Sequence, residues 1–361
     1  MGKLTIISLS NSIKNLVQQS QRQLYQAINT TLVETYFHVG RMIVEHEQQG
    51  HKKATYAAGT LKSLSARLTK ALGKGFSVDN LENMRQFYIS YQQQYEAYLH
   101  KQTKSETVSR KLQAGKTRNV KSETVSRKSP FVLTWSHYLV LRRIEHINER
   151  KFYEIEAFNE NWSVRELQRQ YDSALYERLV LSRNKKKVKE LSTKGHVVLS
   201  PSDAVKDPYI LEFLQLQEEE AYSESDFENA IIRQLENFLK ELGKGFLFVD
   251  RQKRIKIDDE DYKVDLVFYH RLLRCFVLID LKIGTLKHQD LGQLQMYVNY
   301  FDQEIKSEEE NKTIGIILCK NKKENIIKYT LGNNKQIFAS KYKMFFPEKQ
   351  VLNLLNNYKN I

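Results

Sequence analysis

The sequence predicts an α+β protein in which an all-α amino-terminal domain precedes an α/β domain with a central mixed sheet. Two observations predict this fold class. Apolar residues recur three and four positions apart through most of the first half, as on one face of a helix, and the period changes to that of strands after about residue 205. The chain has 361 residues, of which 41% are hydrophobic and only four are proline, so it can form two domains that each bury a core.

Helical patterning begins near the amino terminus and extends from residue 10 to about residue 98. The stretch 73–77 interrupts it, and Ser77 is placed to cap a second helix that carries Arg85. A helix, a short turn and a second helix are compatible with a DNA-reading helix-turn-helix, but such a turn also joins packed helices that have no DNA role. Both interpretations stay open here, with Lys74 and Arg85 as candidate nucleic-acid contacts.

A basic insertion occupies residues 101–130, where the octapeptide KSETVSRK occurs at 104–111 and again at 121–128. A short polar repeat cannot bury a core, so we expect a flexible loop that either contacts phosphates or is simply tolerated. Helical patterning resumes at 135–147. A further helix is predicted after Ser163, which forms a capping-box pattern with Glu166.

The boundary between the domains is predicted from a lysine-rich run followed by two prolines. We expect a basic helical domain over residues 1–182, a linker over 183–204 and the α/β domain over 205–361. The linker contains Lys185, Lys186 and Lys187, which are further candidate nucleic-acid contacts.

The net charge of +14 is concentrated in the first half of the chain. Residues 1–200 hold 33 Lys+Arg and 17 Asp+Glu, a net charge of +16, whereas residues 201–361 hold 24 and 26, a net charge of −2. A basic domain attracts polyanions because neutralising phosphates releases condensed counterions. Nucleic acid is therefore the expected partner, although a basic domain without such a partner has a similar composition.

The sequence shows no apolar run near the roughly 18 residues that cross a bilayer, and no export signal at its start. We therefore expect no membrane partner and a cytoplasmic location. Cys275 and Cys319 each lie in an apolar run typical of a strand, so both are expected to be reduced and buried.

The second half is predicted to run helix, three or four strands, helix, strand. The expected segments are a helix at 226–242, strands at 246–250, 254–258, 264–269 and 275–282, a helix at 289–301 and a strand at 313–319.

Acidic and basic side chains converge in this pattern. Asp280 and Lys282 are two apart on one predicted strand and so share a face. Asp265 lies in the preceding strand, and the short break at 270–274 predicts a hairpin in which paired residue numbers sum to 545. That register places Asp265 opposite Asp280. Two neighbouring carboxylates repel each other unless a divalent cation compensates them, which predicts a metal site.

Three more residues are candidates for the same site. Glu228 lies on the core-facing stripe of the helix at 226–242, but Ser225 stands three residues before it, so the pattern around Glu228 alone favours a capping box. Gln293 and Tyr297 are four apart on the following helix and therefore share a face.

The order of these elements resembles the PD-(D/E)xK nuclease superfamily, specifically its members with a Gln-x-x-x-Tyr helix. Several blocks of the sequence are similar to those of the YhcG family, in which an amino-terminal domain of unknown function precedes the nuclease domain. The blocks that carry this resemblance are GFSVDNLENMRQFY at 75–88, WSHY at 135–138, WSVREL at 162–167, YSESDFE at 222–228, ELGKGF at 241–246, DLVFYHRLLRC at 265–275, LKHQDLGQ at 286–293 and TIGIILC at 313–319.

The resemblance implies a restriction-endonuclease-like second domain and hydrolysis of phosphodiester bonds with Mg²⁺, or with Mn²⁺ in its place. It implies Asp265, Asp280 and Glu228 as metal ligands, and Lys282 as the group that orients or deprotonates the attacking water. Gln293 and Tyr297 belong to the implied catalytic set, where they hold the scissile strand or a water. One departure is the aspartate at 280, where the superfamily often has glutamate.

The implied substrate is DNA, in defence against mobile DNA or in recombination, and a homodimer would suit cleavage of both strands. Two alternatives remain at this point. One is a non-catalytic nucleic-acid-binding or assembly protein associated with a restriction system. The other is a metal-dependent hydrolase of small phosphates, which leaves the basic first half unexplained.

Overall fold

The computed structural model describes residues 6–49, 54–113, 129–181, 185–216 and 222–347. The chain divides into two compact units. The first comprises Met1–Arg150 and Ala157–Leu167, and the second comprises Lys151–Glu156 and Gln168–Ile361. The first unit is helical and the second contains a mixed sheet, so the predicted α+β class is confirmed.

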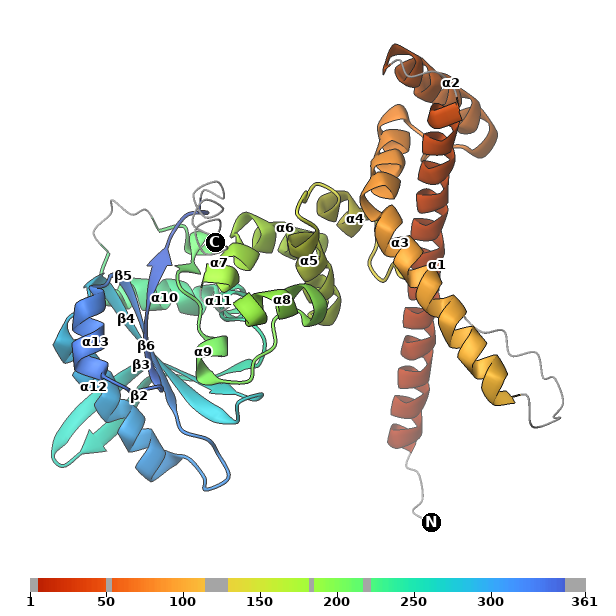
Figure 1. Ribbon diagram of the computed structural model, residues 1–361. Helices are drawn as coiled ribbons and strands as arrows, with labels where there is room; N and C mark the ends of the chain where they lie inside the picture. Colours follow the sequence, from red (N-terminus) through yellow and green to blue (C-terminus); the bar gives the residue numbers. More distant parts are fainter. Residues whose placement is uncertain (1–5, 50–53, 114–128, 182–184, 217–221, 348–361) are drawn as a thin grey trace. The chain divides into compact units, whose positions relative to one another are not determined.

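The first unit is built on two long helices, residues 6–49 and 78–113. The second half of the first helix lies along the other helix (Figure 1), and the apolar faces of both helices meet in this contact. The helices of this part of the chain, some of which continue into the second unit, are α1 (Ile6–Gln49), α2 (Ala54–Leu72), α3 (Val78–Gln113), α4 (Trp135–Leu141), α5 (Ile147–Asn159) and α6 (Val164–Asp172).

An aromatic cluster forms the centre of the first unit. Its fully or almost fully buried rings are Phe37 of α1, Phe87 and Tyr91 of α3, Phe131 just before α4 and Tyr138 of α4. Ring centroids lie 5.8 Å apart for Phe37 and Phe87 and 5.1 Å apart for Phe87 and Tyr138. Tilted and edge-on contacts at these distances add to the free energy of burying such large rings. The cluster therefore fixes α1, α3 and α4 to one another.

The predicted turn between two helices is present. Gly73 and Gly75 adopt positive φ angles of 84° and 117° between α2 and α3, a conformation that glycine adopts without strain. Ser77 caps α3, because its hydroxyl accepts a hydrogen bond from the Asn80 backbone N–H at 3.2 Å. The cap at Ser163 is also confirmed by a 3.2 Å bond from the Glu166 N–H.

The loop predicted over the basic insertion is wrong for its first copy. Residues 104–111 continue helix α3, which ends at Gln113. The octapeptide contains no glycine or proline and carries four good helix formers, so an existing helix propagates through it. The second copy, at 121–128, lies outside the described residues.

The second unit contains a six-stranded sheet with the order β1-β6-β5-β4-β3-β2. Strands β2, β3 and β4 pair antiparallel, whereas β4, β5, β6 and β1 pair parallel, so the sheet is mixed as predicted. Its strands are β1 (Tyr209–Ile210), β2 (Phe246–Ile257), β3 (Glu260–His270), β4 (Cys275–Thr285), β5 (Ile314–Asn321) and β6 (Ile337–Lys343).

Helices cover both faces of this sheet. Two apolar clusters result, one containing Phe227 and Phe238 of the α10–α11 pair and the other containing Leu294 of α12. Cys275 and Cys319 are buried and free, as predicted. The remaining helices of the unit are α7 (Leu175–Leu181), α8 (Lys185–Lys194), α9 (Pro201–Ala204), η1 (Glu212–Leu214), α10 (Glu224–Arg233), α11 (Leu235–Leu242), α12 (His288–Tyr300), the π-helical η2 (Phe301–Ile305) and α13 (Glu324–Leu331).

Several predicted elements differ in extent. The helix expected at 226–242 is two helices that break at Gln234, and the strands expected at 246–250 and 254–258 are the single strand β2. A bulge between Phe248 and Asp250 shifts the register of β2. The expected break at 251–253 is a polar Arg-Gln-Lys run that lies inside this strand. Strands β1 and β6 and helix α13 were not predicted.

The predicted domain boundary at residue 182 differs from the division into compact units. Arg178 of α7 is 1% exposed, and its guanidinium lies 2.7 Å from the carboxylate of Glu241 on α11. Glu241 also pairs with Arg169 at 3.2 Å. These buried ion pairs connect residues 168–181 to the helix that covers the sheet. The segment expected as a linker contains helices α8 and α9.

Candidate active site

The β3–β4 hairpin brings two aspartates together. Paired residues run from Leu266 with Ile279 to His270 with Cys275, and each pair sums to 545 as predicted. Asp265 comes one residue beyond the last pair, so the same register continues to Asp280. The backbone N–H of Leu281 donates a 2.9 Å hydrogen bond to Asp265 Oδ2, which fixes this carboxylate against strand β4.

Asp280 and Lys282 form a close ion pair on strand β4. Lys282 Nζ lies 3.1 Å from Asp280 Oδ2, and the Asp280 residue is only 4% exposed. The pair is close but poorly aligned, because Asp280 Oδ2 is buried and receives no well-directed hydrogen bond. Glu224 Oε2, at the start of α10, lies 3.5 Å from the same ammonium. The lysine is therefore held between two carboxylates.

Burial controls the protonation of the two aspartates. It raises the pKa of Asp280 to about 7, because the neighbouring Lys282 ammonium offsets only part of the cost of desolvating this carboxylate. Burial also raises the pKa of Asp265. For Lys282, desolvation acts to lower the pKa, but attraction to Asp280 and Glu224 outweighs it and the net pKa is raised. Lys282 is thus held as a cation by two carboxylates, and its single positive charge does not fully compensate their negative charge.

Glu228 belongs to this cluster and not to the helix cap. The cap of α10 is Ser223, whose hydroxyl accepts the Asp226 N–H at 3.1 Å, so the Ser225 alternative is wrong. Glu228 is 7% exposed, and its pKa is raised by burial. Because Glu228 does not cap α10, its carboxylate is available to the acidic cluster.

Gln252 connects Glu228 to Asp265. Its side-chain N–H₂ donates to Glu228 Oε2 at 2.5 Å and to Asp265 Oδ1 at 3.2 Å. Gln252 also has a φ of 48°, which is uncommon for a residue other than glycine and typical of functional sites. This bridge shows that helix α10 reaches the hairpin aspartates.

Gln252 and Glu224 were not predicted from the sequence. Gln252 gave no sequence signal, because its position depends on the bulged course of β2. Glu224 did carry one, since it lies one helical turn before Glu228 and therefore on the same face of α10.

The predicted pair on α12 also lies near the aspartates. The Gln293 side-chain N–H₂ donates a hydrogen bond to the Tyr297 hydroxyl, and Tyr297 is 1% exposed. Burial raises the pKa of Tyr297, and the negative charges of Asp280 and Asp265 raise it further. Tyr297 is therefore close enough to the two aspartates for their charges to affect its pKa.

The carboxylates have the chemistry of a partial magnesium site. Within the described ranges, no group of three or more His, Cys, Asp and Glu side chains is arranged to enclose a metal ion. Mg²⁺, however, binds through one or two carboxylates and keeps several waters. Asp265 and Asp280 offer such oxygens, and the buried Asp280 Oδ2 lacks an aligned donor. The residues therefore fit a hard divalent cation.

The predicted nucleic-acid contacts lie elsewhere in the chain. Arg85 is engaged inside the first unit, where it pairs with Glu47 at 2.8 Å and with Glu82 at 3.1 Å. Lys74 is exposed in the turn before α3. Residues 185–187 begin helix α8, and their side chains lie outside the described part of the structure.

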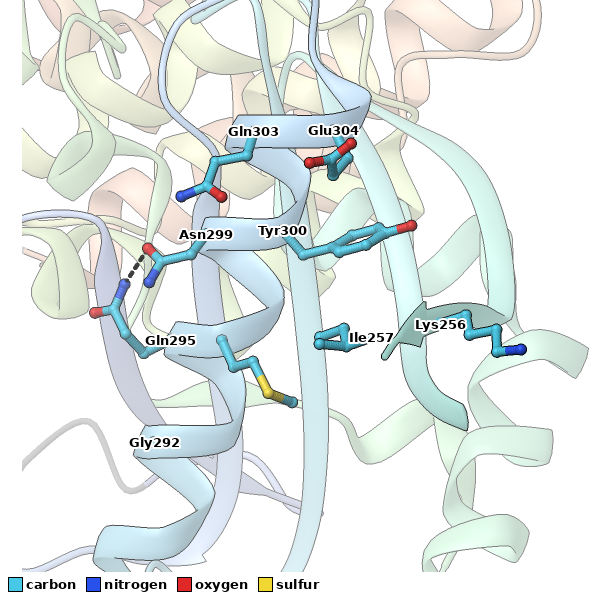
Figure 2. A pocket seen from close by; sticks show the side chains of 9 residues that line it. Lys256, Ile257, Gly292, Gln295, Asn299, Tyr300, Gln303 and Glu304 are labelled. Carbon is cyan, nitrogen blue, oxygen red and sulfur yellow. Dashed lines mark hydrogen bonds between the residues drawn. The ribbon is translucent and has the colours of Figure 1, made fainter. Parts of the chain in front are cut away.

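An open cavity of about 630 Å³ lies beside the other face of α12. Figure 2 shows Tyr300 and Ile257 on its wall and the hydrogen bond between Gln295 and Asn299, 2.9 Å long. None of the lining residues belongs to the acidic cluster, so this cavity is not the reacting centre.

Comparison with known proteins identifies the family of the chain. Residues 202–358 match the family model of the YhcG PDDEXK nuclease domain, and residues 12–178 match that of the DUF1016 N-terminal domain. The fold and the acidic cluster thus define a nuclease of the PDDEXK class, a hydrolase of phosphodiester bonds. The chain belongs to the YhcG family. It is 38% identical over 348 residues to "Putative nuclease YhcG" of Escherichia coli (strain K12), covering 95% of this chain and 92% of the relative.

Two solved structures show weaker likeness. One is a repair endonuclease from Pyrococcus abyssi, with a TM-score of 0.24 and 19% identity over 35% of this chain and 49% of that one. The other is the EndoMS complex with double-stranded DNA, with a TM-score of 0.26 and 20% identity over 36% and 48%. These scores are too low to support an argument about this chain.

Proposed function

We propose that the protein cleaves DNA with Mg²⁺, or Mn²⁺ in its place, at the cluster formed by Glu228, Asp265, Asp280 and Lys282. The observation that carries this proposal is the buried Asp280 carboxylate, which faces Lys282 and Asp265 but lacks sufficient compensating charge. We further infer, from the family resemblance, that the activity serves defence against mobile DNA or recombination.

Asp265 and Asp280 would hold the cation, with Glu228 as a further ligand or as the anchor of a bound water. When bound, Mg²⁺ supplies Lewis-acid stabilisation of the charge that develops on the phosphate. Gln252 holds Asp265 and Glu228 in fixed positions through its two hydrogen bonds. These hydrogen bonds hold the two carboxylates in a defined geometry before a cation binds.

Lys282 acts as a cation in this proposal. Its pKa is raised, so the ammonium stays protonated and orients the attacking water or stabilises phosphate charge. Removing a proton from water requires a neutral amine, so the raised pKa disfavours the deprotonating role that the resemblance also allows. Gln293 and Tyr297 would hold the scissile strand at the edge of the cluster.

The basic first half is proposed to bind the DNA backbone. Its net charge of +16 over residues 1–200 contrasts with −2 for the remainder. Counterion release from neutralised phosphates then supplies most of the binding free energy. Residues 201–361, which have no basic excess of their own, depend on this part of the chain for affinity.

The test is cleavage by the purified full chain of supercoiled plasmid, linear duplex, single-stranded and branched DNA, and RNA. Each substrate is incubated with Mg²⁺, with Mn²⁺ or with a chelator. Metal-dependent cleavage of at least one DNA substrate supports the proposal. Cleavage that survives the chelator contradicts the metal requirement, and cleavage confined to RNA contradicts the assignment of DNA.

A further inference from the structure

The amino-terminal half of α1 exposes an apolar stripe that Ser20 interrupts near its middle. Its members lie along one side of the helix, and each is between 48% and 86% exposed: Ile6, Leu9, Ile13, Val17, Leu24 and Ile28. At 100° per residue they all fall within an arc of about 100°. Figure 1 shows this half of α1 extending beyond the segment that lies along α3. A stripe of this width on a helix in water is normally covered by a partner surface.

The remainder of α1 is packed. Val33 and Phe37 are 0% and 1% exposed, and Ile43 lies in the same apolar cluster as residues of α2 and α3. One helix is therefore anchored in the first unit at its carboxyl-terminal half, whereas the apolar side chains of the stripe at its other half are exposed. Because helix stability in proteins comes mostly from packing of an amphipathic face, the exposed half gains stability from a partner.

The size of the stripe fits a protein–protein interface. From their exposed fractions, the six side chains leave roughly 700 Å² in contact with water, close to the ~800 Å² that each partner of a standard interface buries. The largest apolar patch on a typical monomer is only about 300–600 Å². The stripe alone therefore nearly supplies one side of a stable interface.

The charges of this segment point to the kind of partner. Residues 6–32 contain two charged side chains, Lys14 and Arg22, and both fall outside the arc of the stripe. Two cations are too few for a nucleic-acid surface, and an interfacial membrane helix carries a polar face rich in lysine and arginine. The remaining polar residues are mostly serine, asparagine, glutamine and threonine. The segment therefore suits an uncharged, apolar protein surface.

We propose that the stripe on α1 pairs with the same stripe of a second copy of this chain. Two identical helices present matching apolar surfaces, so a two-fold pair buries one stripe against the other and closes without leaving a free surface. The scarcity of charge within the stripe means that self-pairing incurs little repulsion. The resulting particle is a homodimer joined through α1, whatever its substrate.

The first experiment measures the mass of the full chain in solution by light scattering after size exclusion. We expect twice 42.6 kDa for the wild type. The double substitution Ile13→Glu with Leu24→Glu places charges in the stripe and is expected to give 42.6 kDa. The matched control, Asn15→Glu with Gln26→Glu, adds the same charges at exposed positions outside the arc and is expected to stay dimeric.

The second experiment introduces no charge into the stripe and so does not endanger folding of the protein. Ser20 is exposed, lies within the arc and is near the middle of the stripe, so two copies approach each other there when the helices pair in parallel. Ser20→Cys is therefore expected to form a disulfide-linked dimer on mild oxidation. Gln18→Cys, exposed on another side of α1, is expected to stay monomeric on a non-reducing gel. The native Cys275 and Cys319 are buried and do not compete.

Two results would overturn the proposal. One is a wild-type chain that stays at 42.6 kDa across the micromolar range, which would assign the stripe to a different partner. The other is a stripe variant that dimerises as well as the wild type, which would place the dimer interface elsewhere. Neither result depends on nuclease activity.

Discussion

Asp280 is the residue on which the proposed chemistry of this site depends. Its carboxylate is buried, lies 3.1 Å from Lys282 and receives no well-aligned hydrogen bond. Burial raises its pKa to about 7, so much of the population carries a proton at neutral pH when no cation is bound. A divalent cation favours the ionised form of this group. In the proposed mechanism, Asp280 therefore links protonation to metal binding.

Gln252 gives a first prediction at the scale of single residues. Gln252→Ala removes both hydrogen bonds through which Gln252 connects Glu228 to Asp265. It should weaken Mg²⁺ binding on the order of 10-fold or more. Titration calorimetry of the metal-free protein measures this. Gln303→Ala, at an exposed glutamine on η2, is the control and should bind Mg²⁺ as the wild type does.

A second variant distinguishes the effect of losing the Gln252 side chain from the effect of backbone strain at this position. Gln252→Gly tolerates the φ of 48° without strain but also lacks the amide. It should weaken Mg²⁺ binding as much as Gln252→Ala does. Unchanged affinity in both variants would contradict a positioning role for Gln252.

At the scale of elements, the sequence predicted the central hairpin better than its surroundings. The short break at 270–274 fixed the register of β3 and β4, and with it the approach of Asp265 to Asp280. That prediction succeeded because a hairpin register depends on local turn length. By contrast, β6 pairs with β5 and β1 through parallel contacts between distant segments, which no local pattern reveals.

The helical elements show the same limit. The pattern at 226–242 is continuous, but the structure breaks it at Gln234 into α10 and α11. Glu228 could not be assigned from sequence because two serines precede it, and only the structure identifies Ser223 as the cap. Gln252 reaches the site through a bulged strand, and bulges leave almost no trace in a pattern of period two.

The buried ion cluster around Glu241 gives a prediction about stability. Burial acts to raise the pKa of Glu241, but Arg178, Lys206 and Arg169 outweigh it and lower the pKa to about 2. Glu241→Gln leaves the buried Arg178 without its charged partner and should lower the free energy of unfolding by about 3–5 kcal/mol at pH 7. Denaturant unfolding measures this, with the exposed Glu236→Gln on the same helix as the control.

The same carboxylate has a defined pH dependence. Its folded pKa lies below its ordinary value of 4.5, so its contribution to stability is complete above that pH and is lost as the pH falls towards about 2. The Glu241→Gln variant should lack this part of the acid loss. Wild-type and variant curves that run parallel from pH 5 to pH 2 would show that the ion cluster does not control acid stability.

At the scale of the whole molecule, charge and chemistry are carried by different parts of the chain. The basic excess lies in the first 200 residues and the acidic cluster in the remainder. No helix within the described segments has both the length and the apolar character needed to span a membrane. We therefore expect binding to a polyanion and hydrolysis to be separable properties.

This separation predicts a strong salt dependence that maps to the first half. Binding of the full chain to duplex DNA in a chelator should weaken steeply with salt, because each neutralised phosphate adds about −0.9 to the logarithmic slope. Replacing the exposed Lys62, Lys70 and Lys74 by Gln should reduce that slope. The control replaces three exposed lysines of the second half, Lys312, Lys328 and Lys335, and should leave it unchanged. Equal effects of the two sets would contradict the proposed division.

The most direct test of the proposed site is single-turnover cleavage of a DNA substrate by Asp280→Asn, with Asp259→Asn in the β2–β3 turn as the matched control. The Asp280→Asn variant keeps the shape of the side chain but loses the charge that binds a cation and faces Lys282. We predict that it cleaves at least ~100-fold more slowly with Mg²⁺ while binding DNA as tightly as the wild type. Cleavage by Asp280→Asn at the rate of the control would contradict the assignment of this cluster as the active site.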